Sequence, residues 1–183
     1  MKDHYRLLLS GLALLTLVLF VLSLLAGPAA LGISDSIRAL LTGQGDAIVI
    51  VMREIRLPRA LLGLMIGVTL GLSGAVLQGY LRNPLAEPGL LGVSASASLG
   101  AVIAIYTGLS LAFPLALPLM ALAGAVLAVV LVQALAGRGA GTLTIILAGV
   151  AVSSFAGAMT TLALNLSPNP FAAMEIVYWM LGS

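Results

Sequence analysis

The chain has 183 residues, of which 61% are hydrophobic and only 8% are charged. An average soluble domain carries about 25% charged residues, so this composition excludes a cytosolic globular protein. It also excludes a disordered chain, which needs many charges and few apolar groups. The net charge is +2 and the basic residues form no long run, so no nucleic-acid partner is indicated. The sequence predicts an integral membrane protein embedded in the lipid bilayer.

Long stretches without a charged residue indicate membrane-crossing helices, because a crossing needs about 20 mostly apolar residues. These stretches lack the two-residue alternation of a barrel strand, so we expect an all-α, polytopic helix bundle. The first stretch is longer than the apolar part of a secretory signal peptide, which indicates a retained span. Within a single transmembrane domain over residues 1–183, the predicted spans cover residues 7–26, 60–81, 90–107, 114–135 and 143–164, and an outer amphipathic helix covers 171–182.

A charged segment from Arg53 to Arg59 precedes the second predicted span. Lys2 and Arg6 before the first span favour a cytoplasmic N-terminus, which puts this segment outside, against the positive-inside rule. We expect Pro58 to open the second span, so the positive end of the helix dipole would also oppose the arginines, by about 0.3–1 kcal/mol. Two interpretations remain open. The arginines dock carboxylates of an extracytoplasmic partner, or they reach lipid phosphates at the membrane surface.

Small and polar residues lie on one face of two predicted spans. In lipid, small residues four apart allow close helix packing, and hydroxyl groups either bond to a neighbouring helix or line a wet pathway. The packing stripe of the second span consists of Gly63, Gly67 and Gly71. The pathway candidates of the fifth span are Ser153, Gly157 and Thr160. Pathway lining and helix–helix hydrogen bonding remain alternatives for the fifth span.

The composition also argues against several chemistries. No ionisable residue lies in the middle of a predicted span, which disfavours a proton-coupled or other secondary transporter. No phosphate-binding loop of the G-x-x-x-x-G-K-[ST] type is present, so energy for any transport has to come from another subunit. The chain has no cysteine, and its one histidine is His4 near the N-terminus. We therefore expect no catalytic site, no metal site and no cofactor.

Five motifs occur in an order that resembles the permease family of bacterial ABC importers for ferric siderophores, haem and cobalamin. The likeness covers roughly residues 46 to 183. The motifs are Ile55–Arg59, Gly67–Gln78, Arg82–Ser94, Leu147–Val150 and Tyr178–Ser183. The versions of these motifs around Glu87 and Tyr178 are slightly closer to cobalamin permeases than to siderophore permeases.

The resemblance implies a multi-pass protein of the bacterial plasma (inner) membrane with ten spans. It implies a dimer with a second permease subunit, two cytoplasmic ATPase subunits, and a periplasmic or lipid-anchored substrate-binding protein. That protein would dock on Arg56 and Arg59, and a cytoplasmic gate would fall on Gly141 and Thr142.

In such a family the chain would be the N-terminal half, a fragment or a truncated reading frame that does not transport by itself. The alternative is a stand-alone small membrane protein, such as a channel-like oligomer or an assembly factor.

Overall fold

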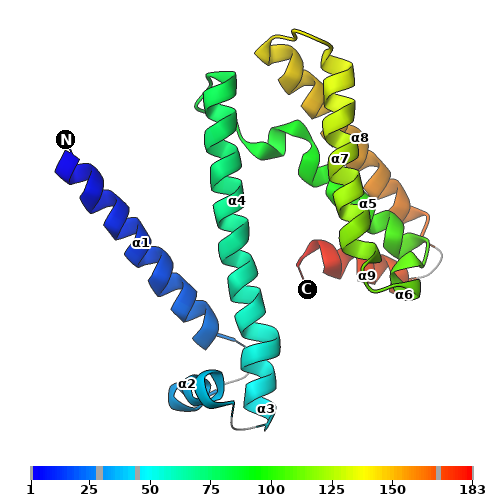
Figure 1. Ribbon diagram of the computed structural model, residues 1–183. Helices are drawn as coiled ribbons and strands as arrows, with labels where there is room; N and C mark the ends of the chain where they lie inside the picture. The colour runs from blue at the N-terminus through cyan, green and yellow to red at the C-terminus, as the bar shows by residue number, and fades with distance from the viewer. Residues whose placement is uncertain (1, 28–30, 44–45, 168–169, 183) are drawn as a thin grey trace. The chain divides into compact units, whose positions relative to one another are not determined.

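The structure is a computed structural model that describes residues 2–27, 31–43, 46–167 and 170–182 (Figure 1). Every regular element in these ranges is a helix, which confirms the expected all-α membrane fold. Contacts divide the chain into two units, Met1–Gly71 and Leu72–Ser183. The described helices long and apolar enough to cross a membrane are His4–Leu25, Ala47–Leu81, Ala116–Ala136 and Thr142–Asn165.

The first unit contains two helices that end close to a glycine. Helix α1 (Lys2–Leu25) is an apolar helix of 24 residues. Helix α2 (Ile33–Thr42) ends at Gly43, whose φ of 68° is left-handed and favours glycine. Because both helices stop at these points, the carbonyl groups of their last turns need partners outside the helix.

A long continuous helix follows, and it contradicts our expectation that Pro58 opens the second span. It consists of α3 (Asp46–Val49), a π-helical segment (Ile50–Arg56) and α4 (Leu57–Leu81). Pro58 has no N–H to donate to the carbonyl group four residues back, so it disturbs an ordinary α-helix. The structure accommodates it directly after a wider π turn, in which the Leu57 N–H donates to the Met52 carbonyl oxygen five residues back.

This continuity also corrects the expected dipole penalty on the arginines. The unpaired N–H groups of a helix lie in its first turn, which here begins at Asp46. Arg53 lies in the π-helical segment and Arg59 in α4, inside the helix rather than at its start. The positive end of the dipole therefore does not oppose these side chains, and the charge cluster needs another explanation.

The second unit is a group of helices around α5. Its elements are a 3₁₀ turn (Pro88–Leu91), α5 (Val93–Tyr106), α6 (Leu109–Ala112), α7 (Ala116–Ala136), α8 (Thr142–Asn165) and α9 (Pro170–Met180). Helix α5 has 14 residues. At 1.5 Å per residue it is about 21 Å long, shorter than a hydrocarbon core of about 30 Å. The predicted third span, 90–107, is interrupted because Gly92 turns the chain at a φ of 73°.

Helices α5 and α7 approach so closely that their backbones touch at two glycines. A Cβ atom on Gly100 of α5 would overlap the carbonyl oxygen of Met120 on α7. A Cβ atom on Gly124 of α7 would overlap the carbonyl oxygen of Ser96 on α5. This reciprocal pairing sets an antiparallel register and shows why both positions are glycine.

The packing stripe expected from the sequence lies elsewhere, in α4. Gly63, Gly67 and Gly71 each have no described atom within 4 Å of the place where a Cβ atom would stand. The described part of the chain therefore does not cover this face, and its role in packing stays a prediction.

Two apolar clusters complete the second unit. One joins α5 to α9 through Val102, Ile105 and Ile176, and Trp179 packs against it. The other joins α7 to α8 through Ala128, Val132, Ala148 and Val152. Small residues dominate the second cluster, consistent with helices that pack closely in lipid.

The contact between α5 and α7 yields a stability test. We expect Gly100→Ala and Gly124→Ala to lower the free energy of unfolding by about 1–3 kcal/mol each, because the backbones must separate to admit a methyl group. Gly63→Ala is the matched control, since its added methyl group meets no described atom. The measurement is thermal unfolding of the chain in detergent. Equal melting temperatures for all three variants would contradict the close approach.

Candidate functional site

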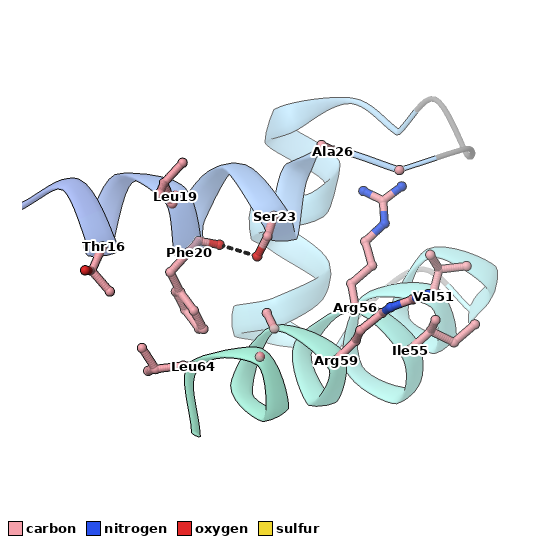
Figure 2. A pocket seen from close by; sticks show the side chains of 13 residues that line it. Thr16, Leu19, Phe20, Ser23, Ala26, Val51, Ile55, Arg56, Arg59 and Leu64 are labelled. Atoms are coloured by element: carbon pink, nitrogen blue, oxygen red, sulfur yellow. Dashed lines mark hydrogen bonds between the residues drawn. The ribbon is translucent and has the colours of Figure 1, made fainter. Parts of the chain in front are cut away.

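The charged segment from Arg53 to Arg59, the arginine segment, binds the ends of two helices of the first unit. Arg56 is buried, with 7% of its surface exposed. Its Nη1 donates hydrogen bonds to the carbonyl oxygens of Leu24 and Leu25, at 3.1 and 3.0 Å, in the last turn of α1. Figure 2 shows the Arg56 side chain extending from the long helix toward the end of α1 near Ala26. A cation placed there satisfies unpaired carbonyl groups and the negative end of the helix dipole.

Arg53 makes the corresponding contact with α2. Its Nη2 donates to the carbonyl oxygen of Leu40, at 2.7 Å, in the last turn of that helix. The segment expected to receive an external partner thus holds two helix ends of its own unit. Sequence reasoning missed this function, because nothing local to the arginines shows which carbonyl groups they will reach.

Arg59 differs from Arg56 in its exposure. It lies three residues further along, in the first turn of α4, and is exposed, whereas Arg56 is buried. Of the two expected docking residues, the structure therefore presents Arg59 to its surroundings and turns Arg56 inward. A guanidinium group stays charged at all physiological pH values and binds carboxylates with two parallel hydrogen bonds.

A cavity of about 830 Å³ adjoins these arginines within the first unit. Its walls are mostly apolar side chains of α1 and of the long helix, as Figure 2 shows. Arg56 and Arg59 are the charged residues that line it, and Thr16 and Ser23 supply hydroxyl groups. Ser23 donates its hydroxyl to the Phe20 carbonyl oxygen at 2.8 Å. This arrangement can bind an anionic group beside apolar surface. Among the described residues, no group of three or more His, Cys, Asp or Glu side chains could hold a metal ion.

The expected gate residues lie where α8 begins. Gly141 precedes the helix with an ordinary φ of −71°, and Thr142 is its first residue. Both are exposed. The turn before them depends on Gly137 and Gly139, which have φ values of 78° and 75°. A cavity of about 750 Å³ adjoins this loop and includes Arg138 in its lining.

The polar face of α8 is divided between packing and open space. Gly149 lies against the Leu90 carbonyl oxygen of the 3₁₀ turn, and the Ser153 N–H would stand 3.0 Å from a Cβ on Gly92. Thr160 is buried, with 7% of its surface exposed. Gly157 alone of the three pathway candidates is exposed, with no described atom within 4 Å of a Cβ placed there. On this face Gly149 and Thr160 are therefore packed, Ser153 is half-buried, and Gly157 borders open space.

The chain is similar to known proteins over almost its whole length. The sequence profile of the FecCD transport family matches residues 15–183. The chain is 41% identical over 181 residues to the vitamin B12 import system permease protein BtuC of Salmonella typhi and of Salmonella newport (strain SL254). Each match covers 99% of this chain and 53% of the relative. The chain thus spans about half the length of the curated relatives it matches.

A solved structure supports the same relationship. It is described as an inward-facing conformation of a metal-chelate type ABC transporter, and it matches with a TM-score of 0.72 and 32% sequence identity. The match covers 96% of this chain and 51% of that chain. At this identity the likeness supports both the fold and the family.

Gly92 offers a test of how the 3₁₀ turn packs against α8. Its φ of 73° disfavours any side chain by about 1–2 kcal/mol, and a Cβ would stand 3.0 Å from the Gly149 carbonyl oxygen. We expect Gly92→Ala to lower the melting temperature of the chain in detergent. Gly89→Ala, in the same turn, adds a methyl group at an ordinary 3.5 Å from the Glu87 carboxylate and should leave it unchanged. A melting temperature that falls equally in both variants would count against this packing.

Proposed function

Because this chain belongs to the FecCD transport family, we propose that it forms part of the transmembrane permease of a binding-protein-dependent ABC importer. The observation that carries the proposal is the 41% identity over 181 residues to vitamin B12 permeases. The chain is then a multi-pass protein of the bacterial inner membrane. The stand-alone membrane protein is the weaker alternative, because it does not account for a family match over residues 15–183.

The proposal assigns energy and assembly to partner proteins. Two cytoplasmic ATPase subunits hydrolyse ATP, a second permease subunit completes the dimer, and a periplasmic or lipid-anchored protein delivers the substrate. The sequence supports this division because it contains no phosphate-binding loop and no ionisable residue in the middle of a span. The permease itself is not an enzyme.

The proposed substrate is a metal chelate of the class that includes cobalamin, haem and ferric siderophores. Within that class we favour cobalamin. The similar permeases of Salmonella typhi and Salmonella newport are named for vitamin B12 import, and the motifs around Glu87 and Tyr178 resemble the cobalamin version.

The proposed docking site is the arginine segment, on the extracytoplasmic side of a chain whose N-terminus is cytoplasmic. Arg59 is exposed beside an apolar cavity, which suits an acidic side chain at the edge of a protein interface. Arg56, the second expected docking residue, is buried one turn earlier and supports the docking site from there. Substrate then passes between the two permease subunits while ATP binding closes the ATPases.

The cytoplasmic gate is proposed at Gly141 and Thr142, and the pathway along the face of α8 that carries Ser153, Gly157 and Thr160. The exposed loop at the start of α8 supports the gate, because Gly137 and Gly139 give it backbone freedom. The open surface at Gly157 supports the pathway.

Reversing one charge tests docking. In the assembled importer, we expect Arg59→Glu to weaken binding of the substrate-binding protein about tenfold or more. The variant loses a charge-assisted hydrogen bond of about 1.5–3 kcal/mol, and 1.4 kcal/mol is a factor of ten. The control is Arg38→Glu, an exposed arginine on α2 that lies outside the segment. Affinities measured by titration that are unchanged by Arg59→Glu would refute docking at this residue.

The pathway is tested by single-cysteine labelling, since the chain has no cysteine of its own. We expect Gly157→Cys to react with a charged thiol reagent in the reconstituted importer, because a wet pathway allows the reactive thiolate to form. Phe155→Cys is the control, exposed but on the opposite side of the helix, where lipid would prevent thiolate formation. Equal labelling of both positions, or of neither, would rule out a pathway along this face.

A further inference from the structure

The two arginine contacts share one local design. In both, a helix of the first unit stops next to a glycine, and a guanidinium group from the long helix covers that glycine. A Cβ on Gly27, just after α1, would lie 2.6 Å from Arg56 Nη2. A Cβ on Gly43, just after α2, would lie 3.1 Å from Arg53 Nη1. Because glycine has no side chain, the guanidinium groups have space to reach the carbonyl oxygens of the last helical turns.

The acceptors are groups that need a donor. The Leu24 and Leu25 carbonyl groups are in the last turn of α1, and the Leu40 carbonyl group is in the last turn of α2. Such groups have no partner inside their own helix. A permanent cation satisfies the hydrogen bond and the negative end of the helix dipole together.

The π-helical segment explains how neighbouring arginines reach different helices. Arg53 and Arg56 are three residues apart, and in an α-helix such positions lie close together on one face. A π turn holds more residues than an α turn, so the same spacing separates the two side chains by a wider angle around the axis. One side chain then extends to the end of α2 and the other to the end of α1.

We propose that Arg53 and Arg56 are positioning residues that fasten the ends of α2 and α1 to the start of α4. They thereby set the place of Arg59, which contacts the partner directly. This last step rests on the proposed docking function, whereas the fastening of the helix ends does not. The two residues have different roles. Arg59 is exposed and binds the partner, whereas the buried Arg56 holds the end of α1 beside the docking surface.

The test measures the distances from α1 to α4 and from α2 to α4 in variants that lack either Arg56 or Arg53. Spin labels go on exposed sites in the full permease in lipid nanodiscs: Leu17 on α1, Leu41 on α2 and Met65 on α4. We expect Arg56→Gln to broaden and lengthen the distance distribution between labels at 17 and 65, and Arg53→Gln to do so only between labels at 41 and 65. Arg38→Gln, which removes an exposed arginine of α2 outside the segment, is the control and should leave both distributions unchanged.

A second set of variants guards against a protein that merely misfolds. Gly27→Val keeps every arginine but displaces the Arg56 guanidinium group, and we expect it to reproduce the effect of Arg56→Gln. Arg56→Lys restores the charge with a single ammonium group and should recover part of the original distribution. Unchanged distributions in both Arg56→Gln and Gly27→Val, or the same broadening of both label pairs by either arginine substitution, would overturn the proposal.

Binding of the substrate-binding protein separates this inference from the proposed function. If Arg59→Gln leaves affinity unchanged while the label distances shift as expected, the helix ends are fastened but docking does not occur at Arg59. If docking is as proposed, Arg59→Gln weakens binding about tenfold, and Arg56→Gln weakens it less, in proportion to the displacement of α1.

Discussion

The last carbonyl groups of a helix need donors that the helix cannot supply, and in a membrane protein water does not always supply them. The hydrogen bonds from Arg56 to Leu24 and Leu25 meet this need for α1. These hydrogen bonds join the end of α1 to the long helix within the first unit. The cation cluster is then part of the fold as well as a candidate binding surface.

The second unit is organised by a different constraint, the distance between helix backbones. Helices α5, α7 and α8 bring glycines against carbonyl groups of their neighbours, at Gly100, Gly124 and Gly149. Lipid tails provide no hydrophobic drive between helices, so close contact and small residues replace the large side chains of a soluble core. The buried clusters agree, since alanine and valine fill the contact between α7 and α8. This packing sets the position of α8, and the exposed pathway candidate Gly157 lies on the same face as the packed Gly149.

The apolar stretches predicted most of the helices because bilayer thickness constrains composition directly. The family likeness also pointed to the arginine segment. What escaped prediction depends on tertiary contacts. Pro58 suggests a helix start, and only the π-helical segment before it shows how the helix continues through it. The sequence indicated packing at Gly63, yet in the described chain Gly100, which it did not single out, touches another backbone. Arg56 and Arg59 have the same chemistry, and their different burial comes from where α1 ends.

The central claim is that the arginine segment divides its work between holding helix ends and docking a partner. A structure of the assembled importer with its substrate-binding protein bound tests this most directly. The account predicts a partner carboxylate within hydrogen-bond distance of Arg59, with Arg56 still bonded to the last turn of α1. A complex in which Arg56 has left Leu24 and Leu25 to bind the partner, or in which the partner contacts neither arginine, would contradict it.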